Sequence, residues 1–171
     1  MGENGAGKST LMKILFGDED ATEGDIIFEG NKIQPKSAAD TIRLGIGMVH
    51  QHFMLVDSLR VYENVILGME PKNGIMIDKE KAIQAVEETA KKYNLKIDPM
   101  AVVGELSVSQ KQKVEILKVL LRGAKLLILD EPTAVLTPQE TDELFEQLLL
   151  LKKNHHTIIF ISHKIREVMQ I

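Results

Sequence analysis

The sequence lacks cysteine and tryptophan, and only 4% of its residues are aromatic. Without cysteine the chain has neither disulfide bridges nor thiolate metal sites, which agrees with a reducing compartment. With so few aromatic side chains, a surface on which nucleic-acid bases stack is not expected. No apolar run approaches the roughly 18 residues of a membrane-spanning helix. If the protein works at a membrane, we expect it to do so through a partner.

The rest of the composition is that of a globular protein with a charged surface. The 171 residues suit one domain, or one domain carrying a subdomain, and 44% of them are hydrophobic, which is enough for a core. Charged residues make up 27%, the formal net charge is −4, and neither sign forms a long block. A basic nucleic-acid groove is not indicated, so we expect no nucleic-acid partner.

The chain opens with MGENGAGKST, which contains the pattern G-x-x-x-x-G-K-S from Gly2 to Ser9. In such a loop, glycines such as Gly5 and Gly7 let backbone N–H groups approach phosphate oxygens closely. Lys8 supplies a positive charge for the β- and γ-phosphates, and the Ser9 hydroxyl can bind Mg²⁺. A flexible glycine-rich turn is the alternative interpretation. The pattern favours a phosphate-binding loop.

A phosphate-binding loop usually lies between a strand and a helix, and this sequence indicates only the helix. The stretch from Lys8 to Phe16 repeats apolar residues at helical spacing and stops at Gly17, which predicts a helix with its positive end under the phosphates. The usual strand before the loop is absent, because only Met1 precedes Gly2. We therefore expect a chain whose front strand has been removed.

The next part of the sequence predicts short strands and a connector. Residues 26–33 read as an antiparallel hairpin with a turn at Gly30-Asn31. The connector from Ser37 to Leu44 reads as a short helix, and Ile46 to Val49 as a short buried strand that ends at Gln51. The side chains expected on the solvent side of the connector are Asp40, Thr41 and Arg43.

From about residue 55 to 105 helical spacing replaces strand-like patterns. Asp78 is a suitable N-cap for a helix from Lys79 to Tyr93, and the preceding GMEPKNG reads as a turn-rich break. Ser107 and Gln110 then form a capping box that starts another helix, which Gly123 closes. The apolar face expected on that helix consists of Val114, Leu117, Leu120 and Leu121.

Two carboxylates follow the most apolar strand of the sequence. Leu126 to Leu129 are four consecutive apolar residues, typical of a parallel strand that is covered on both faces, and Asp130 and Glu131 stand at its carboxyl end. Open α/β sheets bind their ligands at that end. Two acidic groups there are costly unless a cation or water network engages them. Two solvated loop carboxylates are the alternative.

The last part of the sequence repeats this arrangement. Thr137 starts a helix with an N-cap, a proline and a glutamate in the favoured positions. Thr157 to Ile161 reads as a second apolar strand, which ends next to His163. A parallel arrangement of the two strands directs His163 toward the same edge as Asp130.

The ordered set of P-loop, Gln51 after a short strand, LSVSQ at a helix start, LLILDEP and a strand ending in His163 resembles the ATP-binding subunit of ABC transporters. The resemblance covers nearly the whole chain. It implies an α/β P-loop NTPase fold with a RecA-like parallel core, a small antiparallel β subdomain and an inserted α-helical subdomain, here incomplete. We expect core and β subdomain in residues 1–54, the helical subdomain in 55–123, and the Walker B and switch-histidine part in 124–171.

The resemblance also implies a role for each matching position. Gln51 would reach Mg²⁺ and the attacking water and link to the transmembrane partner, Asp130 would hold Mg²⁺ through water, and Ser9 would be a further metal ligand. Glu131 would be the general base, and His163 the switch histidine at the γ-phosphate. The residues that would hold the phosphates are Gly2, Glu3, Asn4, Gly5, Ala6, Gly7, Lys8, Ser9 and Thr10.

The segment from Leu106 to Gln110 resembles the family signature, which contacts ATP held by a second subunit. Ser107, Ser109 and Gln110 would make these contacts from a helix N-terminus. The family usually has two glycines where this chain has Val108 and Ser109, and the Cβ of Ser109 would crowd the γ-phosphate.

The resemblance implies an ATPase that uses ATP and Mg²⁺. Details such as HQHFMLVDSL and DEPTAVLTPQE are similar to the sugar and nucleoside importer branch. The implied partners are transmembrane permease subunits, a second ATPase domain and, indirectly, a substrate-binding protein, at the cytoplasmic face of the cell membrane. The alternatives are a soluble ABC ATPase that is not a transporter, or an inactive truncated fragment. We expect the isolated 171-residue chain to be poorly stable.

Overall fold

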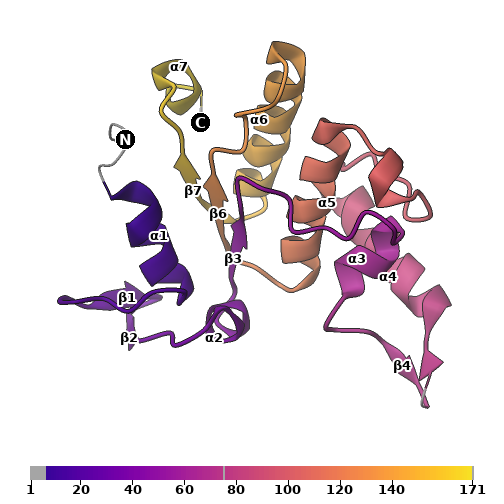
Figure 1. Ribbon diagram of the computed structural model, residues 1–171, viewed down its shortest axis with the longest axis horizontal. Coiled ribbons are helices and arrows are strands. Elements are labelled where there is room, and N and C mark those ends of the chain that lie inside the picture. The colour runs from indigo at the N-terminus through magenta and orange to yellow at the C-terminus, as the bar shows by residue number, and fades with distance from the viewer. Residues whose placement is uncertain (1–6, 75, 171) are drawn as a thin grey trace.

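A parallel β-sheet forms the centre of the molecule, as the computed structural model shows for residues 7–74 and 76–170. In these ranges the sheet has three strands in the order β3-β6-β7 (Figure 1). Strand β6 pairs in parallel with both neighbours, so that Leu126 lies between Ile46 and Thr157. The strands are β3 (Ile46–Val49), β6 (Leu126–Asp130) and β7 (Thr157–Ile161). The predicted parallel core is confirmed.

Both faces of β6 are covered, as its unbroken apolar run predicts. Leu126 and Ile128 pack on one face with Met12 and Phe16 of helix α1 (Lys8–Phe16). Leu127 and Leu129 pack on the other face, against the two long helices α5 (Val108–Leu121) and α6 (Pro138–Lys153). Alternate side chains of one strand therefore serve two separate cores.

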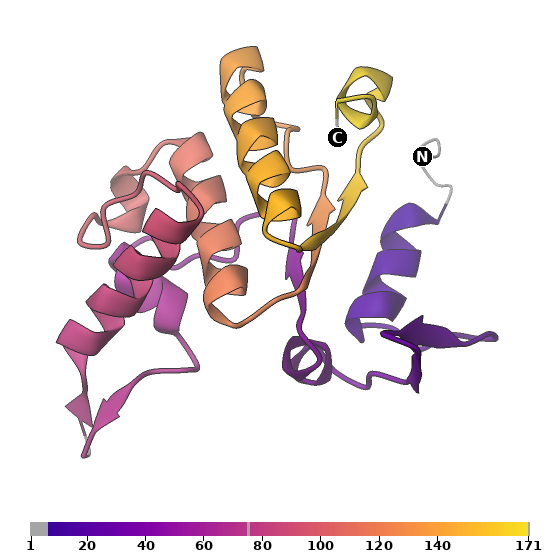
Figure 2. The ribbon, with the colours of Figure 1, turned by 180° about the vertical axis from the view of Figure 1, so that it is seen from behind.

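A small hairpin lies at one end of the molecule (Figures 1 and 2). Strand β1 (Ile26–Phe28) pairs antiparallel with β2 (Asn31–Ile33), which confirms the predicted hairpin. Its turn is formed by Glu29 and Gly30, both with positive φ (49° and 79°), rather than by Gly30-Asn31. Asn31 instead pairs with Phe28 in the ladder.

Helix α2 (Ala38–Arg43) follows the hairpin and corrects one prediction. Thr41 is fully buried instead of solvent-exposed. Its hydroxyl donates to the carbonyl oxygen of Phe16 at 2.9 Å, which joins α2 to the end of α1. A polar residue is tolerated inside because this hydrogen bond satisfies it.

The opposite end of the molecule is helical, as predicted (Figure 1). It contains α3 (Val61–Ile66) and α4 (Lys79–Lys92), whose N-cap Asp78 accepts from the Lys81 N–H at 3.0 Å. The turn-rich break before α4 contains a two-stranded hairpin that the sequence did not indicate, β4 (Lys72–Asn73) with β5 (Met76–Ile77). A single 3₁₀ turn, Val103–Glu105, precedes α5.

Helix α5 joins the helical end to the sheet. The sequence predicted one apolar face, but α5 is buried around most of its circumference, including Glu115. It packs against α3 and α4 on one side and against β3 on the other. In the described ranges, no helix combines the length and the apolar character needed to cross a bilayer.

Candidate functional site

The N-terminal end of α1 lies on the same side of the molecule as the carboxyl ends of β6 and β7 (Figures 1 and 2). Gly7 caps this helix in the left-handed conformation (φ 79°), where glycine carries no steric penalty. Its carbonyl accepts from the Leu11 N–H at 2.9 Å, so the helix begins where the motif predicts. Lys8 opens the helix, and Thr10 is exposed.

Several predicted phosphate-binding positions lie outside the described residues. These are Gly2, Glu3, Asn4, Gly5 and Ala6, together with the side chain of Ser9. The structure does describe the start of α1. The positive charge of Lys8 there lowers the pKa of Asp130 at the end of β6. The charge at the start of α1 therefore reaches the predicted carboxylate.

Asp130 and Glu131 leave the end of β6 in different ways. Asp130 is the last residue of the strand, whereas Glu131 turns with φ 46°, a left-handed conformation that is unusual for a side chain of its kind. The Glu131 N–H donates to the carbonyl of Ile161 at 3.0 Å, which fixes the turn to the end of β7. Burial raises the pKa of Asp130, and the negative charge of Glu131 raises it further, while His50 and Lys8 lower it less.

His163 lies at the sheet edge that the parallel-strand argument predicts, and there it contacts Glu131. Its Nδ1 lies 3.1 Å from Glu131 Oε1, within hydrogen-bond distance. The side chain of His163 is half exposed, and that of Glu131 is 20% exposed. The histidine end of the pair is therefore accessible to solvent, while Glu131 is mostly covered by protein. The structure thus brings together two residues that are 32 positions apart in sequence.

A buried carboxylate that the sequence did not single out supports this contact. Glu167, in helix α7 (Ile165–Val168), accepts from the hydroxyls of Thr133 and Ser162, each at 2.7 Å. It also pairs with Lys164 Nζ at 3.0 Å. Burial alone raises the pKa of Glu167, but the hydrogen bonds from Ser162, Thr133 and Lys164 outweigh it, and the pKa lies below its ordinary value. Glu167 therefore locks the residues that flank His163 to the loop after Glu131.

Gln51 follows β3 by two residues at the same edge of the sheet, and its side chain is exposed. His50, between β3 and Gln51, is partly buried, and its ring meets that of Phe16 edge-on with centroids 6.0 Å apart. The edge thus presents Gln51 from β3, the two carboxylates from β6 and His163 from β7.

The signature-like turn belongs to the helical end. Its capping box is confirmed, because the Gln110 N–H donates to Ser107 Oγ at 3.3 Å and the Ser107 N–H donates to Gln110 Oε1 at 2.9 Å. Ser109 is buried and Val108 is exposed. Among the described residues, no recorded hydrogen bond joins this turn to Glu131 or His163.

The chemistry of the edge fits a nucleotide-bound Mg²⁺. Asp130 and Glu131 offer hard carboxylate oxygens, and burial, followed by the neighbouring Glu131 charge, raises the pKa of Asp130. A bound cation would offset both effects. The described residues include no group of three His, Cys, Asp or Glu side chains that would enclose a metal alone. Mg²⁺ usually keeps several waters and is held jointly by one or two carboxylates and substrate phosphates, so this sparse donor set suits it.

Two solved structures define the class of fold. A nucleotide-free ATP-binding cassette from an ABC transporter aligns with a TM-score of 0.84 and 28% identity, over 98% of this chain and 70% of that chain. A dimeric ATP-binding cassette in a post-hydrolysis state, bound to ADP and Pi, aligns with a TM-score of 0.77 and 25% identity, over 99% of this chain and 75% of the other. The fold is that of an ATP-binding cassette.

The sequence comparisons give the family. The model of the ABC transporter family matches residues 1–134, and the chain belongs to that family. The chain is 48% identical over its whole length to the nucleoside import ATP-binding protein NupA of Lactococcus lactis subsp. cremoris (strain MG1363), of which it covers 34%.

Two further relatives carry related names. The chain is 51% identical to the guanosine import ATP-binding protein NupO of Bacillus subtilis (strain 168), over 93% of this chain and 31% of NupO. It is 43% identical to the galactose/methyl galactoside import ATP-binding protein MglA of Escherichia coli (strain K12), over 100% of this chain and 34% of MglA. The chain spans about a third of the length of these curated relatives. The resemblance to the sugar and nucleoside importer branch is confirmed.

Proposed function

We propose that this chain is the catalytic part of an ATPase that binds ATP with Mg²⁺ and hydrolyses the nucleotide to power import of a sugar or nucleoside. The observation that carries the proposal is the contact between Glu131 and His163 at the ends of adjacent parallel strands, beside the start of α1. A base, an orienting histidine and a helix N-terminus at one sheet edge are the elements that phosphoryl transfer to water requires.

The catalytic step follows from these positions. The Glu131 carboxylate accepts a proton from the attacking water as the water oxygen bonds to the γ-phosphorus, and the bond from that phosphorus to the bridging oxygen of ADP breaks. His163 would orient Glu131 through the 3.1 Å contact and would donate to the γ-phosphate. Gln51 would position the water from the β3 side.

The remaining residues bind and orient the nucleotide. The loop formed by Gly2, Glu3, Asn4, Gly5, Ala6 and Gly7 would surround the phosphates with backbone N–H groups, with Lys8 and Thr10 beside it. Ser9, Gln51 and Asp130 would hold the Mg²⁺. When bound, the metal supplies positive charge to the β- and γ-phosphate oxygens.

The proposed site is completed by a second ATPase domain. Ser107, Ser109 and Gln110 form the capped N-terminus of α5, which would approach ATP held by that second domain. The dimeric state of one aligned cassette supports this arrangement. The proposed division of the chain remains 1–54 for core and β subdomain, 55–123 for the helical subdomain, and 124–171 for the second part of the core.

The proposed partners are transmembrane permease subunits and, through them, a substrate-binding protein, with the ATPase at the cytoplasmic face of the membrane. The names of the relatives, which concern import of nucleosides, guanosine and galactose, support an importer over an ATPase unconnected with transport. Within this class the names favour a nucleoside or a sugar as the solute.

The test replaces Glu131 by glutamine in the full-length protein that carries this chain, assembled with its permease. ATP binding should persist, while phosphate release should fall by a factor of about 10² or more, because glutamine cannot accept the proton. The control is Glu146→Gln, since Glu146 is exposed on α6. Undiminished hydrolysis in Glu131→Gln would remove this residue from the role of base.

A further inference from the structure

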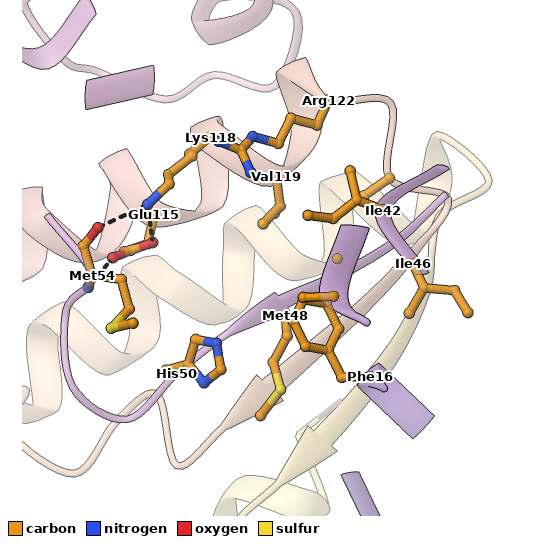
Figure 3. A pocket seen from close by; sticks show the side chains of 13 residues that line it. Phe16, Ile42, Ile46, Met48, His50, Met54, Glu115, Lys118, Val119 and Arg122 are labelled. Carbon is orange, nitrogen blue, oxygen red and sulfur yellow. Dashed lines mark hydrogen bonds and ion pairs between the residues drawn. The ribbon is translucent and has the colours of Figure 1, made fainter. Parts of the chain in front are cut away.

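The chain that leaves β3 first binds helix α5 at Met54, before it reaches α3. The Met54 N–H donates to Glu115 Oε1 in a short hydrogen bond, and the Met54 carbonyl accepts from Lys118 Nζ at 2.8 Å (Figure 3). Both polar groups of one backbone residue are thus bound by two side chains from adjacent turns of α5. We refer to Glu115 and Lys118, with their two bonds to Met54, as the α5 clamp.

The two side chains of the clamp are largely buried and carry opposite charges. The side chain of Glu115 is 4% exposed and that of Lys118 is 15% exposed, with Lys118 Nζ 3.7 Å from Glu115 Oε2. A buried carboxylate is costly unless it is paired and hydrogen-bonded, and here it is both. The clamp lies at the polar end of a cavity of about 200 Å³ (Figure 3). The apolar part of the wall includes Phe16, Ile42, Ile46, Met48 and Val119.

Packing of the Met54 side chain does not explain why the chain is fixed here, because Met54 as a residue is 62% exposed. Beyond Met54 the chain belongs to the helical end. The backbone N–H and carbonyl of Val56 bond the buried amide of Asn64 at 2.7 and 3.0 Å, and Asp57 pairs with Lys111 at 2.8 Å. Met54 is thus the place where the chain leaving the sheet first binds α5.

The clamp connects two parts of the proposed site over a short distance. Gln51 lies three residues before Met54, which spans at most about 11 Å of extended chain. The Ser107–Gln110 turn lies on the same helix as the clamp, and Gln110 and Glu115 are separated by about 7.5 Å along the helix axis. A shift of α5 relative to the sheet must therefore pull on the segment that carries Gln51.

We propose that Glu115 and Lys118 are positioning residues that fix Gln51 relative to the signature-like turn, so that both move with α5. The inference rests on the proposed function, since it assigns Gln51 a place at the reacting water. Neither clamp residue contacts nucleotide in this arrangement. Each acts on catalysis only through the Met54 backbone.

The test compares Glu115→Met and Lys118→Met, which remove the acceptor and the donor of the clamp, with Lys113→Met in the full-length protein assembled with its permease. Lys113 pairs with Glu143 at 3.1 Å, so its variant removes an ion pair from the same helix without touching the clamp. Both clamp variants should lower kcat about tenfold, a change of about 1.4 kcal/mol in the barrier, while the KM for ATP stays within about twofold because the phosphate loop is unchanged. Lys118→Arg, which keeps charge and donors, should restore most of the rate.

A second measurement is independent of activity. Spin labels on cysteines introduced at His52 and Lys91, both exposed, report the distance between the Gln51 segment and α4. The distance distribution should broaden in the clamp variants and stay unchanged in Lys113→Met. Since this chain has no cysteine of its own, only cysteines outside it need replacement.

Three results would overturn the inference. One is a lower melting temperature with unchanged kcat per folded molecule, which indicates a purely structural pair. Another is a raised KM with unchanged kcat. The third is an unchanged label distance in both clamp variants. A parent protein that does not hydrolyse ATP at all would instead refute the proposed function, and the label distances would still decide the role of the clamp.

Discussion

At the scale of single residues, Glu167 shows how a carboxylate remote from the reacting atoms shapes a site. Its partners Ser162 and Lys164 flank His163 in sequence, and Thr133 follows Glu131 by two residues. Glu167 thereby joins the two loops whose contact defines the proposed catalytic pair. Its hydrogen bonds are charge-assisted, and such bonds are roughly twice as strong as neutral ones.

We predict that Glu167→Gln lowers the free energy of unfolding by about 1–3 kcal/mol at pH 7, because the amide cannot satisfy both hydroxyls and Lys164. The pKa of Glu167 is lowered in the folded protein, so its stabilising effect is present above the ordinary value of 4.5 and is lost as the pH falls below it. The difference from the parent should therefore shrink in urea unfolding below about pH 4.5. An equal loss at pH 7 and pH 3.5 would contradict the account. Glu87→Gln, at an exposed position on α4, is the control.

The sequence predicts the positions of some site residues but not the burial of others, because burial depends on partners from distant elements. The position of His163 at the same sheet edge as the two carboxylates was predictable, because parallel strands end at one edge. Glu167 and Thr41 were not, because their burial depends on partners contributed by other elements: Thr133 lies 34 residues from Glu167, and Phe16 lies 25 residues from Thr41. Their polar character alone favours the surface.

At the scale of secondary-structure elements, α5 packs closely on β3 because residue 47 of β3 is a glycine and has no side chain. A Cβ at Gly47 would lie 2.9 Å from Val119 Cβ and 3.0 Å from Ala124 Cβ. Since Gly47 does not have a positive φ, the glycine is required for close packing and not for an unusual backbone.

We predict that Gly47→Ala lowers the free energy of unfolding by about 1–3 kcal/mol, the usual cost of overpacking a dense core. Strand β3 leads to Met54, which the α5 clamp holds. A displaced β3 should therefore also broaden the distribution of distances between the two spin labels described above. Chemical denaturation measures the first effect. Unchanged stability would show that α5 and β3 can separate without cost.

The beginnings of helices were the most predictable elements. The N-caps Asp78, Ser107 and Thr137 each accept from the expected backbone N–H, because capping is decided within four residues. The hairpin of β4 and β5 was missed, since each strand has only two residues in a turn-rich segment. The burial of Glu115 was missed as well, because a charged residue on a helix is normally a sign of the solvent face.

At the scale of the whole molecule, His156 ties the helical end to the sheet. Its Nδ1 lies 2.9 Å from the carbonyl of Ala124, two residues before β6, and its Nε2 lies 2.8 Å from the hydroxyl of Tyr93 at the end of α4. Neutral histidine satisfies both, with Nδ1–H donating to the carbonyl and Nε2 accepting from the hydroxyl. Burial lowers the pKa of His156. The bond to Ala124 raises it by less than burial lowers it, and the charge of nearby Lys92 adds a smaller lowering effect.

We predict that the parent protein loses more stability between pH 7 and pH 5 than His156→Gln does. A histidine whose pKa is lowered by folding contributes stability above its ordinary value of 6.5, and this contribution is lost as the pH falls. Urea midpoints measured across this range give the comparison. Parallel pH profiles for parent and variant would exclude His156 as the source. His155→Gln, at the exposed neighbouring position, is the control.

The overall architecture was predictable from the order of motifs, and the family comparison confirms it. The way in which the helical end sits on the sheet was not. That placement depends on single contacts such as those of His156 and Glu115, and neither contact produces a periodic pattern in the sequence. The poor stability predicted for the isolated chain stays a prediction.

The turn at Glu131 has a consequence for protein engineering. Its φ of 46° lies in the region where glycine and asparagine are the favoured residues. A procedure that chooses side chains to suit this backbone would therefore replace Glu131 and delete the proposed base. Selection for thermal stability alone would also favour replacement of Glu131. Stabilisation of this turn would thus remove the residue on which the proposed chemistry depends.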